Sequence, residues 1–71
     1  MQIDIRKSII NNFLDLDVSD IKSSIEEAIV ENEEITLPGL GVLFEIIWKC
    51  SDDDVRNLIL NLIKNNIKNN R

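Results

Sequence analysis

The stretch from Leu37 to Trp48 places the strongest constraint on how this 71-residue chain can fold. It contains the only proline, both glycines, the only tryptophan and one of the two phenylalanines. Read as a helix, the stretch has Pro38 in its first turn, where a missing N–H costs nothing and the fixed φ suits the helix. One broad face then carries apolar side chains at i, i+3, i+4, i+7 and i+8, namely Leu40, Leu43, Phe44, Ile47 and Trp48.

The same stretch also permits a β-hairpin. Gly39 and Gly41 would form the turn, and residues 42–48 would form a buried strand. Against this reading, Glu45 and Lys49 are four residues apart in the order that stabilises a helix, and no other segment is a clear partner strand. The helix is therefore the preferred prediction, and an α+β fold with a hairpin at residues 37–48 is the alternative.

A helix over this stretch would be apolar on nearly every side, because Val42 and Ile46 add a second apolar stripe. Such a helix has to be covered by other elements or by a second subunit. The absent side chains of Gly39 and Gly41 would let another helix, or the partner's Trp48, approach closely. We therefore predict that the stretch forms a core or a homodimer interface, with these candidate residues: Leu37, Pro38, Gly39, Leu40, Gly41, Leu43, Phe44, Ile47 and Trp48.

Three further segments have helical periodicity. The first spans residues 4–14, and the second spans residues 20–32 with Ser19 as its N-cap. The third begins at Ser51, a good N-cap, and three aspartates follow at the positive end of the helix dipole. It continues to about residue 68. We predict a single all-α domain over residues 1–71, a small bundle of about four short helices.

The sequence argues against several functional classes. The chain has no histidine and a lone Cys50, which excludes an intramolecular disulfide, the usual zinc sites and histidine-based triads. Gly39 and Gly41 lack the third glycine of a dinucleotide fingerprint and the lysine of a P-loop. No apolar run reaches the roughly 18 residues that a membrane span needs. We predict a non-enzymatic, intracellular protein with no cofactor, no metal and no membrane span.

The net charge of −5 is unevenly distributed along the chain. All thirteen acidic residues lie in positions 1–54, whereas positions 55–71 carry four basic residues and no acidic one. An acidic protein is a poor ligand for phosphate backbones, so nucleic acid is not the expected partner. The basic end is explained by charges that complement a helix C-terminus. The alternative is a weak nucleic-acid contact through Lys64, Lys68 and Arg71.

The central stretch is similar to a known protein family. Residues 37–45, followed by Ile47-Trp48-Lys49, closely resemble the most recognisable block of the I-type small acid-soluble spore proteins of endospore-forming Firmicutes. Ile25, Ala28-Ile29 and Glu33-Glu34 lie upstream at similar distances from this block. The resemblance is specific over about residues 25–49 and covers the whole chain in register.

The resemblance implies a protein that is made late in sporulation and located in the spore core. This minor class differs from the abundant α/β-type proteins that coat spore DNA, and the sequence pattern of those proteins is not found here. The family has no catalytic residues to transfer. We therefore expect a minor spore-core protein with a structural or interaction role. The alternatives are weak nucleic-acid association through the C-terminal helix and an amino-acid storage polypeptide degraded at germination.

Overall fold

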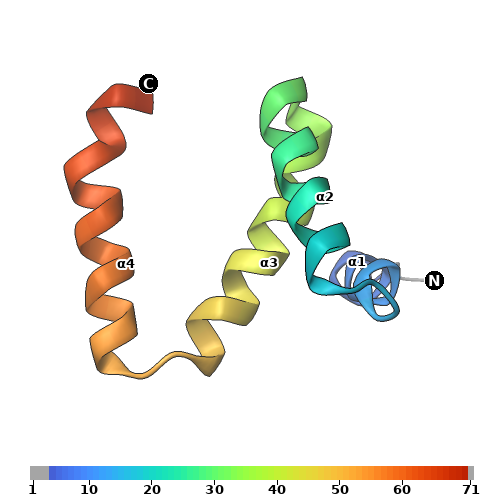
Figure 1. Ribbon diagram of the computed structural model, residues 1–71, viewed down its shortest axis with the longest axis horizontal. Coiled ribbons are helices and arrows are strands. Elements are labelled where there is room, and N and C mark those ends of the chain that lie inside the picture. Colours follow the sequence, from blue (N-terminus) through green and yellow to red (C-terminus); the bar gives the residue numbers. More distant parts are fainter. Residues whose placement is uncertain (1–3, 71) are drawn as a thin grey trace.

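The computed structural model describes residues 4–70, and over this range it contains helices and no strand (Figure 1). The all-α prediction is confirmed, and a helix replaces the alternative hairpin. A short 3₁₀ turn, Glu34–Thr36, precedes the third helix, and another, Ile67–Asn70, follows the fourth. The four α-helices are α1 (Ile5–Phe13), α2 (Val18–Glu31), α3 (Leu37–Cys50) and α4 (Asp53–Asn66).

The first two helices are each capped by an aspartate. The Asp4 carboxylate accepts a hydrogen bond from the Lys7 backbone N–H at 3.0 Å. Asp17, and not the predicted Ser19, caps α2 by accepting from the Asp20 N–H at 2.9 Å. The Ser19 hydroxyl donates to the same carboxylate at 2.8 Å, and these bonds to the ionised form lower the pKa of Asp17. Helix α2 therefore begins two residues before the predicted start.

Helices α2 and α3 are joined by a sharp reversal. Asn32 ends α2 in the left-handed conformation, with φ of 52°, which asparagine tolerates better than most residues. The 3₁₀ turn follows, and Pro38 then lies in the first turn of α3, as predicted from its missing N–H.

Helix α4 begins after a two-residue link. The predicted cap, Ser51, is wrong: its hydroxyl donates to the Ile47 carbonyl at the end of α3. The N-cap is Asp52, whose carboxylate accepts from the Val55 N–H at 2.9 Å. Asp53 and Asp54 occupy the first turn of α4, where negative charge is favourable. Ser51 thus bonds to the last turn of α3 and Asp52 caps the first turn of α4, so the corner between the two helices is short.

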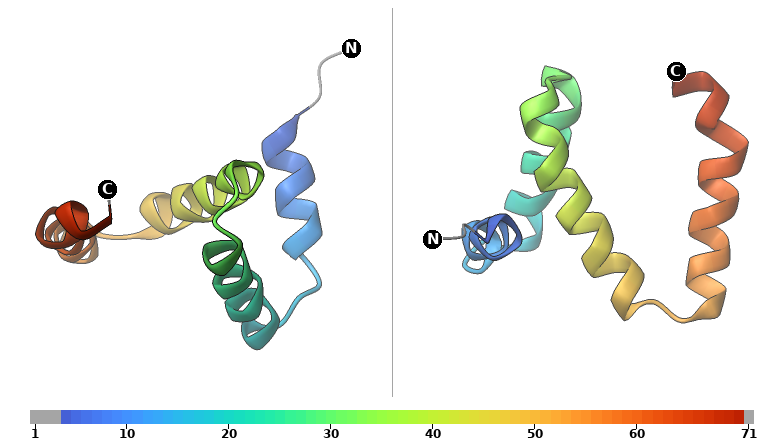
Figure 2. Two further views of the ribbon diagram at one scale, coloured as in Figure 1. Left: turned by 90° about the horizontal axis from the view of Figure 1, so that it is seen from above. Right: turned by 180° about the vertical axis from the view of Figure 1, so that it is seen from behind.

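The packed part of the molecule consists of α1, α2 and α3. Helices α1 and α2 both lie against α3, and the views in Figure 2 agree on this arrangement. Val42, on α3, is the only buried residue among residues 4–70, at 7% exposure. Half-buried apolar residues from the three helices surround it, namely Ile9, Phe13, Ile21 and Leu43. The core is therefore small and centred on the middle of α3.

Helix α4 extends away from this core. Beyond the two-residue link it lies apart from α1, α2 and the rest of α3 in every view (Figures 1 and 2). Its predicted apolar face consequently has no cover from the described part of the chain: Leu58 is 59% exposed and Leu62 is 56% exposed. The four predicted helices are present, with three packed together and the fourth projecting.

Candidate interaction surface

The structure divides the predicted core and interface residues of α3 between two sides. Leu40 and Leu43 are half-buried on the side that faces α1 and α2. Phe44 and Ile47 remain exposed, and Trp48 is half-buried near the corner with α4. Leu37, Pro38 and Gly41 are also exposed, whereas Gly39 is half-buried. Of the predicted apolar face of α3, the side chains of Leu40 and Leu43 thus belong to the core, whereas those of Phe44 and Ile47 lie at the surface.

The exposed end of α3 is organised around Trp48. The Phe44 and Trp48 rings are stacked, with centroids 6.1 Å apart and an interplanar angle of 28°. Arg56, from the first turns of α4, places its guanidinium carbon 5.1 Å from the centroid of the Trp48 ring. A guanidinium over an aromatic face is held by the quadrupole of the ring. The guanidinium of Arg56 therefore contacts the aromatic pair, and no helix among the described residues packs over it.

Arg56 also caps the end of α3. Its Nε and Nη2 atoms both donate to the Trp48 carbonyl, at 3.0 and 2.8 Å, and the Ser51 backbone N–H donates to the same oxygen at 3.4 Å. The charge distribution predicts that the basic residues of positions 55–71, Arg56 among them, complement a helix C-terminus. The helix end that Arg56 complements is that of α3, not that of its own helix. No sequence signal identifies this contact, because it depends on the geometry of the corner.

Helix α4 presents an apolar stripe with opposite charges at its two ends. The stripe has the i, i+3, i+4, i+7, i+8 spacing of a helix face that packs on another element. Asp52, Asp53 and Asp54 precede it, and Lys64 and Lys68 lie at its end, all exposed. We use the name α3–α4 surface for a set of exposed or half-buried apolar residues on these two helices, namely Phe44, Ile47, Trp48, Val55, Leu58, Ile59, Leu62 and Ile63.

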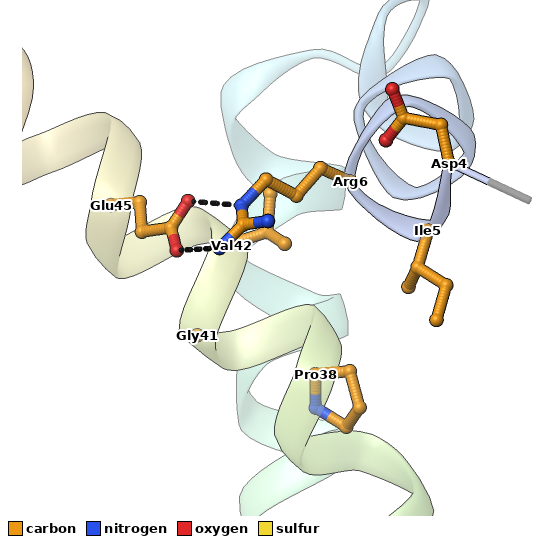
Figure 3. A pocket seen from close by; sticks show the side chains of 7 residues that line it. All are labelled: Asp4, Ile5, Arg6, Pro38, Gly41, Val42 and Glu45. Carbon is orange, nitrogen blue, oxygen red and sulfur yellow. Dashed lines mark hydrogen bonds and ion pairs between the residues drawn. The ribbon is translucent and has the colours of Figure 1, made fainter. Parts of the chain in front are cut away.

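A groove of about 690 Å³ lies on the other side of α3, between α1 and α3. Figure 3 shows the ion pair at its edge: both carboxylate oxygens of Glu45 accept from Arg6, with Nε–Oε2 and Nη2–Oε1 distances of 2.8 Å. The i, i+4 spacing predicts that Glu45 pairs with Lys49 on α3. The partner is instead 39 positions away, and the bidentate contact ties α1 to α3.

The ion pair predicts a specific acid dependence. The hydrogen bonds from Arg6 lower the pKa of Glu45 below its ordinary value of 4.5, and Lys49 adds a weaker effect in the same direction. A lowered pKa in the folded state stabilises the fold at neutral pH, and this contribution is lost as the pH falls through that lowered pKa. We expect the Glu45→Gln variant to lose less stability than the wild type between pH 7 and pH 3 in urea unfolding.

The control for this prediction is Glu27→Gln, which removes one exposed carboxylate from α2 without touching the ion pair. Its pH dependence should match that of the wild type. Equal acid sensitivity in the wild type and Glu45→Gln would show that the Arg6–Glu45 pair adds nothing to stability.

The glycines of α3 give a second test. A Cβ atom added at Gly39 or Gly41 would meet nothing within 4 Å among residues 4–70, so the close approach predicted there does not occur within this part of a single molecule. Because glycine inside a helix costs about 1 kcal/mol relative to alanine, we expect Gly41→Ala to raise the free energy of unfolding by about that amount. Urea unfolding measures it. A fall in stability together with loss of self-association would instead place a partner helix against Gly41.

The described residues contain no cluster of side chains that could hold a metal ion. No group of three or more histidine, cysteine, aspartate or glutamate side chains is clustered within residues 4–70. None of the helices in this range is long and apolar enough to span a bilayer. Cys50 is exposed, and its thiol lies 3.4 Å from the Ile47 carbonyl. The surface features left to explain are therefore the exposed apolar residues and the charges that flank them.

Comparison with known proteins gives a consistent result. A family profile described as "Small, acid-soluble spore protein I" matches residues 3–67. The protein of that name from Bacillus cytotoxicus is 36% identical over 69 residues, which cover 97% of this chain and 99% of the relative. The relative from Geobacillus kaustophilus is 34% identical over 96% of this chain and 99% of its own length. No solved structure matches the chain.

The Bacillus subtilis relative is likewise 34% identical, over 96% of both chains. The matched range contains the whole block of residues 37–49, from which the resemblance was first drawn, so that prediction is confirmed. This chain therefore belongs to the family of small, acid-soluble spore protein I.

Proposed function

We propose that this spore protein is a non-enzymatic interaction protein of the spore core, that residues 1–71 act as one unit, and that the α3–α4 surface is its binding surface. The observation that carries the proposal is the exposure of large apolar side chains on adjacent helices. Phe44 and Ile47 are 42% and 47% exposed on α3, and Leu58 and Leu62 are more than half exposed on α4. Several large apolar side chains exposed along the same helices mark interaction sites in soluble proteins.

The extent of the exposed surface supports the same proposal. The chain has an accessible surface of 6503 Å², whereas a compact folded protein of 8.2 kDa is expected to have about 4,500 Å². Burying apolar surface stabilises a protein by about 25 cal/mol for each Å² removed from water, and this stabilisation is absent while the surface stays exposed. The excess is therefore better explained by a surface that is covered in an assembly than by a chain that acts alone.

The test is chemical cross-linking inside intact spores that express tagged variants. Leu58→Lys with Leu62→Lys places charges on the α3–α4 surface. The control, Val18→Lys with Val30→Lys, makes equally large changes at residues of α2 that are 84% and 83% exposed. We expect cross-linked species larger than the 8.2 kDa chain for the wild type and the control, and their loss for the surface variant.

Other outcomes would refute the proposal. If the wild type gave no larger species, the chain would act alone, and the storage alternative would be favoured. If the control lost them as readily, the α3–α4 surface would not be the binding surface. Titration of duplex DNA at low salt separates the nucleic-acid alternative, because phosphate contacts are strongest there. Binding that disappears in a Lys64→Gln, Lys68→Gln variant would favour that alternative.

The relatives are named acid-soluble, and the composition of this chain gives a physical reason to expect the same property. The net charge is −5 at neutral pH and passes through zero near pH 4.5. Once the thirteen acidic side chains are protonated, eight positive side chains remain, and their mutual repulsion favours solubility. We expect turbidity to be highest near pH 4.5 and to clear at pH 2. Precipitation that persists at pH 2 would contradict this.

A further inference from the structure

We infer that the partner covering the α3–α4 surface is a second copy of this chain, and that the two α4 helices pair antiparallel across a two-fold axis. This inference rests on the proposed function, because it names the occupant of the same surface. It moves the centre of the interface from α3, where the sequence analysis placed it, to α4.

Helix α4 needs a cover of some kind. It is 14 residues long, and isolated helices of that length are marginal in water. Its contact with the described remainder of the chain is limited to the corner, where Arg56 holds the end of α3. The side chains that should stabilise it by packing, such as Leu58 and Leu62, are exposed. An ordered α4 therefore implies a surface that buries its apolar stripe.

The missing area is of the size that a homodimer supplies. The accessible surface exceeds that expected for a compact chain of this mass by about 2,000 Å². Stable interfaces bury about 800 Å² on each partner, and obligate homodimers bury about 1,000–2,500 Å² on each. Two chains that covered each other's α3–α4 surfaces would account for the excess without any third component.

The charges on α4 select both the partner and its orientation. The N-terminal end carries Asp52, Asp53 and Asp54, and the C-terminal end carries Lys64 and Lys68, all exposed. In an antiparallel pair, each acidic end lies beside the basic end of the other copy, and the helix dipoles also oppose favourably. A parallel pair would bring six aspartates together at one end. The charge pattern of α4 is therefore complementary to that of a second α4 that runs in the opposite direction.

The apolar stripe allows such a pair to close symmetrically. With the two-fold axis near Ile59, Val55 lies level with the partner's Ile63, and Ile63 lies level with the partner's Val55. Each copy then offers the same patch to the other, which is the requirement of an isologous interface. An isologous pair of this kind is closed by its symmetry, so assembly through this patch stops at two copies.

The first experiment is light scattering over a concentration series with charge-reversed variants. We expect the wild type to have twice the 8.2 kDa mass. Lys64→Glu with Lys68→Glu makes both ends of α4 acidic, and Asp53→Lys with Asp54→Lys removes the acidic end. Each should weaken self-association by at least tenfold. An equimolar mixture of the two should restore a dimer, which a mere folding defect could not do. Glu26→Lys with Glu27→Lys on α2 is the matched control and should dimerise normally.

The second experiment tests the orientation by cysteine cross-linking in a Cys50→Ser background. A disulfide requires Cα atoms within about 7 Å. In an antiparallel pair, Val55→Cys and Ile63→Cys chains should cross-link with each other when mixed, and neither should cross-link with itself. Self-linked chains of each variant, without the mixed product, would establish a parallel pair and overturn the inferred orientation.

These results separate the inference from the proposed function. A purified wild type that stays at 8.2 kDa at every concentration overturns the self-pairing. If such a chain still forms larger cross-linked species in spores through the α3–α4 surface, the proposed function holds and the partner is a different molecule. A purified dimer that persists in the Leu58→Lys, Leu62→Lys variant shows that the copies meet elsewhere.

Discussion

The Val42→Asp variant is expected to be unfolded at neutral pH. Val42 is the only buried residue among residues 4–70, and it lies where α1 and α2 meet α3. An uncompensated buried charge costs about 3–5 kcal/mol, which is as much as the core of so small a chain supplies. Far-UV circular dichroism should show the loss of most of the helical signal.

The matched control is Val30→Asp on α2. It makes the same chemical change at a valine that is 83% exposed, so its helical signal and its urea midpoint should stay close to those of the wild type. If the Val42→Asp variant kept a wild-type spectrum and midpoint, the packing of α1 and α2 on α3 would not be what holds the chain together.

The Trp48→Ala variant is expected to lower the free energy of unfolding by about 2 kcal/mol, below the roughly 3–5 kcal/mol of a fully buried aromatic. Three contacts are lost together: the stacked Phe44 ring, the Arg56 guanidinium over the indole, and the apolar area at the corner. The backbone carbonyl of residue 48 remains, so part of the Arg56 contact survives. Urea unfolding followed by circular dichroism measures the change.

A double-mutant cycle with Arg56→Ala separates these contributions. We expect a coupling energy of about 1 kcal/mol between Trp48 and Arg56, the size of a partly exposed cation–π contact. Arg56→Lys keeps the charge but loses the planar fork that grips the carbonyl, so it should behave more like alanine than like arginine. Additive effects of Trp48→Ala and Arg56→Ala would mean that the stacked contact does not stabilise the corner.

The helices were predictable because their signals are local. Pro38 in a first turn, aspartates before α4 and the apolar spacing of each segment all act within a few residues. The caps were less predictable, since Asp17 and Ser19 are both good N-caps. The choice between them depends on which residue has extended backbone, and in the structure this is Asp17, with ψ of 175°.

The contacts between helices were not predictable from the same rules. Glu45 has a suitable cation four residues away, yet Arg6 binds it from α1. The amphipathic pattern of α4 predicts a face that packs on another surface, but no pattern in the chain states whether that surface is α3 or another molecule. The direction in which α4 leaves the corner depends on Ser51, Asp52 and Arg56 together, whereas capping rules apply to each residue separately.

The narrow attachment of α4 has a consequence for amide hydrogen exchange. Because α4 shares little packing with α1, α2 and α3 beyond the corner, it can open as a separate unit while the other helices stay closed. Protection of its amides then depends on how often a second chain occupies the apolar stripe. Diluting the protein should speed amide exchange in residues 53–66 and leave exchange around Val42 unchanged. The ratio of the exchange rates in these two regions would therefore depend on the protein concentration.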